Sequence, residues 1–427
     1  MAEDALRSAL NPGVRRRETF GWAMYDFANS GYTTVVLTAV FNAYFVSTVA
    51  GNAPWATFAW TAALSVSFAL VMVAGPIVGA WADAHAAKKP VLLASTIVCI
   101  AGTATLAGAG PGMVGWAVAF IIVSNFAYAI GENICAAFLP ELARPEALGK
   151  VSGWGWSLGY CGGIVALGIS LWWVMTAASR GSTTAEAVGG TMIITAAIYA
   201  LAAVPTFLFL KERAQPDAGA RATAAFARLR ETFVHARQYR DLLLIFACGT
   251  CYQAGVATVI ALAAIYAEQV MGFKTQDTIM LVLLVNVTAA IGAFAFGYAQ
   301  DRLGKVLALR VTIVGWVVMV VVAYFSETRA TFWVAANLAG LCMGSSQSAG
   351  RAIVAYLSPA GRAAEFFGLW GFATRLAAIL GPLTYGAVTW ITGGNHRLAI
   401  LLTGIFFVAA LVVLAFVDER RGRAQVE

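Results

Sequence analysis

The sequence predicts an all-α membrane protein with twelve transmembrane helices in two pseudo-symmetric six-helix bundles. Hydrophobic residues make up 60% of the chain and charged residues 11%, whereas an ordinary soluble domain carries about 25% charged residues. Apolar runs of about 20 residues, the length that a helix needs to cross the hydrocarbon, recur along the chain. Residues spaced alike in its two halves indicate that the chain is built twice.

Counting the apolar runs gives six spans on each side of a polar connector. The expected spans are residues 20–49, 56–81, 90–109, 114–139, 151–177, 189–210, 241–268, 277–300, 306–326, 331–357, 363–391 and 397–417. They divide the chain into a cytoplasmic N-terminal tail (1–19), an N-terminal six-helix bundle (20–210), a cytoplasmic basic connector with weak helical periodicity (211–240), a C-terminal six-helix bundle (241–417) and a cytoplasmic C-terminal tail (418–427).

The distribution of basic residues predicts the orientation of these spans. With the N-terminus in the cytoplasm, 22 of the 28 Lys and Arg residues fall in cytoplasmic segments, four fall outside and two fall within spans. Lysine and arginine are retained on the cytoplasmic side of membranes. We therefore expect both termini in the cytoplasm, in the inner membrane if the chain is bacterial. The lipid bilayer accounts for the net positive charge, so we expect no nucleic-acid partner, and we expect a monomer.

An internal repeat with an offset of 219 residues supports the doubled architecture. Five pairs of identical residues lie in register: Gly131 and Gly350, Ala136 and Ala355, Pro140 and Pro359, Gly149 and Gly368, and Gly162 and Gly381. At the same offset Glu132 matches Arg351. An acid in one half therefore stands where the other half has a base.

A loop motif also occurs twice, after the second and eighth spans. In each copy a glycine precedes an aspartate by four residues, and basic residues follow. The glycine permits close helix approach, and the aspartate can cap a neighbouring helix N-terminus, where the helix dipole favours an anion. Such contacts would form a cytoplasmic gate; the alternative is an ordinary charged turn. The expected gate residues are Gly79, Asp83, Lys88, Lys89, Gly297, Asp301, Arg302, Gly304 and Lys305.

Charged residues well inside spans are the main candidates for a solute site. Glu132, Arg351 and Arg375 each lie within an expected span, and a charge at a helix centre costs about 2.5–3.5 kcal/mol to insert. We expect Glu132 and Arg351 to face each other across the pseudo-twofold axis. The alternative is a permanent ion pair, Glu132 with Arg351 or Asp26 with Arg375, that only fixes helix packing.

The start of the first span adds an acid, an amide and aromatic residues. Tyr25, Asn29 and Tyr32 share one helical face, and Asp26 lies one step around the helix. Burial disfavours a charged carboxylate, so Asp26 or Glu132 could exchange a proton during transport; the alternative for Asp26 is an interfacial anchor or cap. The expected solute-binding residues are Tyr25, Asn29, Tyr32, Glu132, Asn133, Gln347, Arg351, Trp370 and Arg375.

The doubled loop motif resembles the loop signature of the major facilitator superfamily, Gly-x-x-x-Asp-Arg-x-Gly-Arg/Lys. The second copy fits this pattern, whereas Ala84 replaces the arginine in the first. The resemblance implies two six-helix bundles, a central cavity near the bilayer midplane and alternating access.

Further motifs resemble one branch of that superfamily, the autophagy-related vacuolar amino-acid effluxers and their bacterial relatives. These motifs start at Trp22, Asn133, Ser152 and Gln347, the last continuing through Arg351, Phe366, Arg375 and Pro382. For the fungal members the resemblance implies export of neutral amino acids.

Together these features favour a secondary active transporter for a small polar or zwitterionic solute, with an amino acid as a candidate and coupling to protons as a separate hypothesis. No phosphate-binding Gly-x-x-x-x-Gly-Lys-Ser/Thr is present, so ATP is not expected to drive it. We expect no enzyme activity, because His85, His235 and His396 fall in separate loops, and no cofactor or metal. The alternatives are an organic-anion transporter using Arg351 and Arg375, and a non-transporting membrane sensor.

Overall fold

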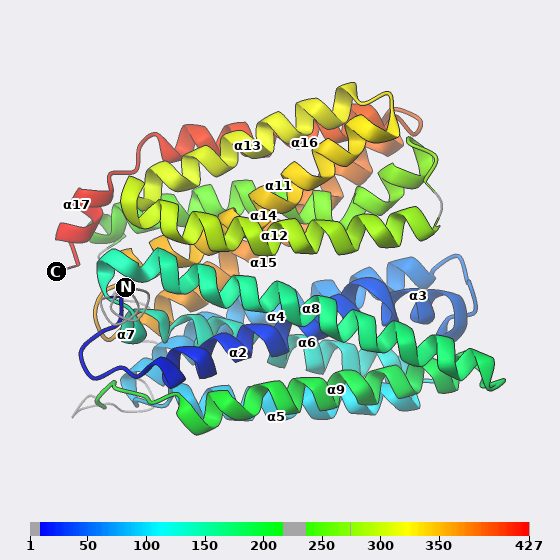
Figure 1. Cartoon of the computed structure of the whole chain (residues 1–427), viewed down its shortest axis with the longest axis horizontal. Coiled ribbons are helices and arrows are strands. Elements are labelled where there is room, and N and C mark those ends of the chain that lie inside the picture. Colours follow the sequence, from blue (N-terminus) through cyan, green and yellow to red (C-terminus); the bar gives the residue numbers. More distant parts are fainter. Residues whose placement is uncertain (1–8, 217–235, 274, 427) are drawn as a thin grey trace.

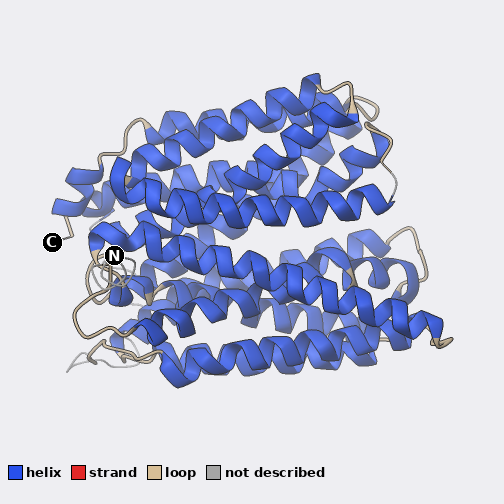
Figure 2. Cartoon of the chain, viewed as in Figure 1, coloured by secondary structure: helices blue, strands red, loops and turns tan. Residues whose placement is uncertain are grey.

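Helices form nearly all of this protein. The computed structural model describes residues 9–216, 236–273 and 275–426, and these residues contain no strand beyond the single bridge between Leu10 and Ala143 (Figure 2). Figure 1 shows the helices in two groups, one from each half of the chain, with their axes roughly parallel.

The first group forms the N-terminal bundle and the second the C-terminal bundle. The long helices of the first are α2 (Arg16–Tyr32), α4 (Ala56–Ala84), α5 (Lys88–Thr105), α6 (Val114–Ala136), α8 (Leu148–Ser179) and α9 (Thr184–Phe209). Those of the second are α11 (Arg240–Gln269), α12 (Thr275–Leu303), α13 (Lys305–Phe325), α14 (Arg329–Leu357), α15 (Ala363–Ile391) and α16 (His396–Leu414).

Within the described residues, 11 helical segments are long and apolar enough to cross a membrane. The expected tenth span, residues 331–357, is not among them, although α14 occupies that stretch and is 29 residues long. Its polar residues include Ser345, Ser346, Ser348 and Arg351, all buried against other helices. A helix that packs on protein along most of its length does not need an apolar surface all around.

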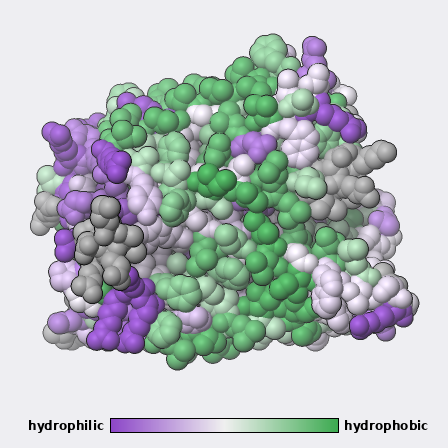
Figure 3. Space-filling view, viewed as in Figure 1, coloured by the Kyte–Doolittle hydropathy of each residue, from purple (hydrophilic) through white to green (hydrophobic). Residues whose placement is uncertain are grey.

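An apolar belt surrounds the molecule between two polar ends. On the face seen in Figure 3, hydrophobic side chains cover the middle of the molecule and hydrophilic side chains gather at both ends of the helices. Large apolar side chains of α9, such as Leu201 and Leu208, are 73% and 69% exposed. This distribution is that of an integral membrane protein.

The first span is less regular than expected. After α2 the chain winds into a π-helix at Thr33–Ala39, the short helix α3 at Phe41–Tyr44 and a second π-helix at Phe45–Val49. π-Helical segments are rare and usually occur as single-turn bulges, often at functional sites. The half of this span farther from the N-terminus is therefore wider and less regular than a continuous α-helix.

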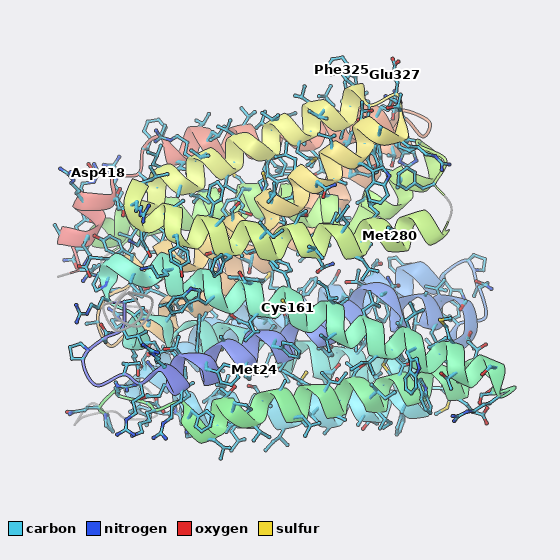
Figure 4. The ribbon with its side chains drawn as sticks, viewed as in Figure 1. Met24, Cys161, Met280, Phe325, Glu327 and Asp418 are labelled. Carbon is cyan, nitrogen blue, oxygen red and sulfur yellow. The ribbon has the colours of Figure 1, made fainter. Side chains whose placement is uncertain are left out.

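Both ends of the chain lie at one end of the molecule, which we call the terminal face (Figure 1). It includes the short helices α7 (Leu139–Leu142) and α17 (Glu419–Ala424). Figure 4 places Asp418 at this face and Glu327 at the opposite one.

The described part of the N-terminal tail is tied to the terminal face. Asn11 donates its backbone N–H to Leu142 O at 3.0 Å, and Arg144 donates its own to Ala9 O at 3.1 Å. The connector expected between the bundles falls largely on residues 217–235, which lie outside the described residues, as does its weak helical periodicity.

Candidate functional site

Two helix pairs bring the bundles into close contact near the terminal face, α4 with α15 and α8 with α12. A methyl group added at Gly79 would overlap the carbonyl of Ala364, and one added at Gly153 would overlap the carbonyl of Ala293. Gly297 faces Gly153 across the second crossing. Glycine therefore permits this approach at both crossings, as expected for the two motif glycines.

Each motif aspartate caps a helix of the opposite bundle. Asp83 accepts a hydrogen bond from the backbone N–H of Glu365, near the start of α15, at 2.9 Å. Asp301 accepts from the N–H groups of Gly149 and Lys150, at the start of α8, at 3.0 and 2.8 Å. The expected capping contact is present in both copies. Because each contact crosses between bundles, separating the bundles at this face breaks it.

The basic residues of the first motif bond within their own bundle. Lys88 forms a short ion pair with Glu141 and lies 3.8 Å from Asp83. Glu212 accepts hydrogen bonds from the backbone N–H groups of Lys88 and Lys89, at 2.7 and 3.0 Å, and so caps α5. Their contacts with these partners hold the N-terminal bundle together.

The second motif repeats this arrangement. Gly304 has a φ of +92°, which favours glycine, and precedes α13. Glu419 accepts a hydrogen bond from the backbone N–H of Lys305 at 2.9 Å, and the Lys305 ammonium lies 4.3 Å from the ring centre of Tyr356. Arg302 is exposed.

Arg351 joins α14 to two helices of the N-terminal bundle. Its guanidinium pairs with Asp26 at 2.6 Å and donates to the side-chain and backbone oxygens of Ser152 at 3.1 and 2.9 Å. The guanidinium also lies over the rings of Trp22 and Trp156, at 4.7 and 5.2 Å from their centres. The Arg351 and Asp26 side chains are only 7% and 12% exposed. This pair is a buried bridge between the bundles.

A second ion pair joins α15 to α6. Arg375 Nη2 lies 2.7 Å from Glu132 Oε2, and the guanidinium lies over the rings of Phe68 and Tyr128. The Glu132 side chain is 32% exposed and that of Arg375 is 15% exposed. Arg375 Nε is buried and has no hydrogen-bond partner. This pair is more accessible than the first and retains an unused donor.

The observed pairing corrects the expected one. Glu132 pairs with Arg375, and Arg351 pairs with Asp26, so the expected facing of Glu132 and Arg351 is wrong. The expected Asp26–Arg375 alternative is wrong as well. Although α6 and α14 occupy equivalent positions in the two bundles, α6 packs across the boundary on α15, and α14 packs on α8.

The two arginines lie at different distances from the ends of their helices. Arg351 precedes the last residue of α14, Leu357, by six residues, and Arg375 follows the first residue of α15, Ala363, by twelve. At 1.5 Å per residue these intervals are about 9 and 18 Å from the terminal-face ends of their helices. The backbone of Arg375 therefore lies farther along its helix from the terminal face than the backbone of Arg351 does.

The three candidate residues from the start of the first span point into the N-terminal bundle. Tyr25 Oη shares a hydrogen bond with Thr96 Oγ1 at 3.0 Å, and Tyr32 Oη shares one with Ser124 Oγ at 2.9 Å. Tyr199 donates to Asn29 Oδ1 at 2.6 Å. Tyr25 and Tyr32 are fully buried. The structure does not bring them to either ion pair, because this helical face packs on helices of its own bundle.

The remaining candidates lie on α6, α14 and α15. Asn133 is 7% exposed, packs against Gly371, and has no partner for its Nδ2. Gln347 exchanges hydrogen bonds with Gln253 of α11, at 2.8 and 3.4 Å. Trp370 packs against Tyr252 of α11, with 6.5 Å between ring centres.

The expected site residues did not include six residues found at these sites: Trp22, Phe68, Tyr128, Ser152, Trp156 and Gln253. Ser152 and Trp156 flank a glycine-rich stretch, and no sequence pattern indicates their contacts with Arg351. Gln253 offered a signal, because it is an isolated amide within an apolar run. Among the described residues, no three His, Cys, Asp or Glu side chains are grouped as metal ligands.

Comparison with known proteins links these features to one family. Residues 46–427 match the family model described as "Vacuole effluxer Atg22 like". The chain is 30% identical over 409 residues to an uncharacterized MFS-type transporter, YxiO, of Bacillus subtilis, covering 93% of this chain and 94% of that one. It is 23% identical over 336 residues to autophagy-related protein 22 of Yarrowia lipolytica, covering 71% of this chain and 56% of that one.

Solved structures show the same fold. The crystal structure of the human organic anion transporter MFSD10 superposes with a TM-score of 0.74, covering 95% of this chain and all (100%) of that one, at 14% identity. At this identity the likeness shows the fold alone.

Proposed function

Because this chain belongs to the Atg22-like effluxer family of major facilitator superfamily transporters, we propose that it carries a small zwitterionic solute, with a neutral amino acid as the first candidate. The Glu132–Arg375 pair is the observation that carries this proposal. It joins the two bundles and leaves Glu132 partly exposed. A solute carboxylate fits the planar guanidinium, and a solute ammonium fits Glu132.

Both ion pairs must separate before the bundles can part at the terminal face. Breaking a buried pair by removing one partner costs about 3–5 kcal/mol, because the remaining charge is left uncompensated. A zwitterion brings one charge of each sign and can replace both partners of the Glu132–Arg375 pair. Solute binding would therefore lower the free energy of opening, which is what alternating access requires.

We assign the terminal face to the cytoplasm and the described conformation to a state closed on that side. The caps, both ion pairs and the hydrogen bond from Ser157 to Ala290 join the bundles in the half nearer the terminal face. One helical turn beyond Ser157, on the same face of α8, Cys161 is exposed (Figure 4). We propose that α8 and α12 separate beyond Ser157 and form a cleft that opens to the outside.

The Asp26–Arg351 pair gives proton coupling a place in the mechanism. Protonation of Asp26 would remove the negative charge that holds Arg351 and so weaken the buried bridge beneath the solute site. Uptake by proteoliposomes with and without an imposed pH gradient tests this role. Equal uptake under both conditions, in wild type and in Asp26→Asn, would exclude proton coupling and leave uniport or exchange.

An organic anion fits the site less well. That alternative depends on two buried arginines, and each of them is paired with an acid. The site as a whole therefore carries no excess positive charge, which favours a zwitterion. A non-transporting sensor would bind the solute but would not move it across a membrane.

Transport of labelled amino acids tests the proposed function. Proteoliposomes containing the wild-type protein should take up at least one neutral amino acid above the rate of protein-free vesicles. Glu132→Gln and Arg375→Gln should each abolish uptake, because one end of the solute loses its partner. Glu327→Gln is the matched control, since Glu327 is an exposed acid at the face opposite the termini (Figure 4).

If uptake persists in both Glu132→Gln and Arg375→Gln, the solute does not bind at the Glu132–Arg375 pair. If no neutral amino acid is taken up or bound, the zwitterion proposal fails.

A further inference from the structure

Two buried hydrogen-bond donors beside the Glu132–Arg375 pair have no partner. They are Arg375 Nε and Asn133 Nδ2. Asn133 is 7% exposed, so water does not readily replace the missing partner. Buried polar groups are nearly always hydrogen-bonded, and an exception calls for an explanation.

The two donors lie on the same small region of the boundary between the bundles. Asn133 follows Glu132 directly, and its amide packs against Gly371 of α15. Arg375 follows Gly371 by four residues, so the two share one face of α15, about one helical turn of 5.4 Å apart. Both donors therefore lie where α6 and α15 meet, and Arg375 also binds the carboxylate of Glu132.

The chemistry of these donors selects their missing partner. Each offers an N–H group, and an ammonium group offers only further donors. A carboxylate has two oxygens and can accept from both at once, with the Arg375 hydrogen bond assisted by charge.

We propose that Arg375 Nε and Asn133 Nδ2 form the carboxylate subsite of the transporter, so that the solute must carry a free carboxylate group. This inference rests on the proposed function and extends it, because it fixes which end of a zwitterion each group binds. The solute carboxylate lies between Asn133 and Arg375, and its ammonium lies at Glu132. The site therefore distinguishes an amino acid from the corresponding amide or amine.

Gly371 keeps this subsite open. A methyl group added at residue 371 would overlap the Asn133 amide. The side chain of Asn133 can therefore keep its position only if residue 371 has none. Gly371 acts as a positioning residue for the amide.

Thermal shifts of the purified wild-type protein test the subsite directly. The ligands are neutral L-amino acids (leucine, phenylalanine, glutamine and alanine), each compared with its C-terminal amide, which keeps the ammonium and the side chain. At least one amino acid should raise the melting temperature. Its amide should need at least about tenfold higher concentration for the same shift, the effect of losing a hydrogen bond to a charged group.

A variant comparison adds a second readout. Asn133→Leu keeps the volume and removes the donor, so it should weaken amino-acid binding by about tenfold and reduce the preference for the acid over the amide. Asn337→Leu is the matched control, because Asn337 lies on α14 and bonds the backbone oxygen of Trp333. It should leave both the affinity and the preference unchanged.

Two outcomes overturn the inference in different ways. Equal shifts from an amino acid and its amide would exclude the carboxylate subsite while the proposed function stands. A lack of shift from every zwitterion would overturn the proposed function and the subsite with it. The wild-type comparison decides the matter even where Asn133→Leu fails to fold.

Discussion

Arginine 351 shows how a single residue can connect three helices. Its guanidinium binds Asp26 on α2 and Ser152 on α8 while its backbone belongs to α14. Two tryptophan rings cover its faces. A planar cation with five donors suits such a site better than an ammonium group would. The residue is therefore a bridge between the bundles, and each of its three guanidinium nitrogens already donates one hydrogen bond.

Replacing Asp26 with asparagine should destabilise the protein. The variant leaves the buried Arg351 charge without its acid, and removal of one partner from a buried pair costs about 3–5 kcal/mol. We expect a lower melting temperature by thermal unfolding and easier opening of the terminal face. Asp418→Asn, at an exposed helix cap, provides the comparison. An unchanged melting temperature would show that the bridge contributes little to stability.

At the scale of elements, the bundles meet through helix ends and glycines. The caps on α15 and α8 satisfy backbone N–H groups that would otherwise lack partners, and they do so from the opposite bundle. The glycines allow the helix backbones to touch. The helix caps and the glycine contacts form only while the bundles are together, so they stabilise one conformation rather than the fold.

Gly79→Val should shift the protein away from the closed terminal face. The new side chain would overlap the Ala364 carbonyl and keep α4 and α15 apart. Distances between spin labels at Glu146 and Arg302, both exposed at that face, should increase in pulsed electron resonance measurements. Gly115→Val is the control, since a methyl group there meets nothing within 4 Å. Identical distance distributions in the two variants would contradict this role.

Each bundle also has a clasp between its first helix and the segment after its last one. In the first, Glu18 pairs with Arg213 at 2.7 Å; in the second, Asp241 pairs with Arg421 at 2.7 Å. The acid side chains are 1% and 0% exposed. The segment from Asp418 onward thus belongs to the fold of the C-terminal bundle.

Arg421→Ala should lower the melting temperature, because it leaves the buried Asp241 without its basic partner. Arg420→Ala should not, because Arg420 is exposed and its backbone N–H makes the helix cap. Differential scanning fluorimetry of the two variants provides the comparison. Equal effects would show that the clasp is dispensable for stability.

For the whole molecule, the described contacts between the bundles gather in the half nearer the terminal face, which is the half that we propose is closed. In this proposal the caps, the Arg351 bridge and the Arg375 pair together close the terminal face. Of the six cysteines, Cys161 is exposed, Cys251 is partly buried and the others are buried. Cys161 lies just beyond the last of these contacts, where it can report on the state of the cleft.

A membrane-impermeant maleimide added from outside should label Cys161 faster than any other cysteine. The reagent needs a water-filled path, which the proposed outward-open cleft provides. Gly79→Val should slow this labelling, because a protein that opens at the terminal face closes on the other side. Mass spectrometry of digested proteoliposomes measures both rates. If Gly79→Val leaves the labelling rate of Cys161 unchanged, opening of the terminal face does not close the opposite face. That result would contradict alternating access.

The sequence predicted which charged residues lie inside the membrane spans more reliably than it predicted which of them pair with each other. The lengths of the apolar runs and the basic loops predicted the membrane-spanning helices and their division between the two halves of the chain. These signals can be read from local sequence, because each span must match the hydrophobic thickness of the bilayer and each basic loop is retained on one side. Glycine and aspartate spacing likewise predicted both capping contacts. The irregular second half of the first span was not predicted, because π-helical turns have no periodic signature.

By itself the sequence determined that charges of both signs lie deep in a helical membrane protein. Glu132, Arg351 and Arg375 interrupt apolar runs, and this holds however the helices pack against one another. Only the tertiary structure decided that Arg375 pairs with Glu132 and that Arg351 pairs with Asp26. Those partners are 243 and 325 residues apart. Their pairing depends on which helix faces cross between the bundles, and periodicity within one helix carries no information about its neighbours.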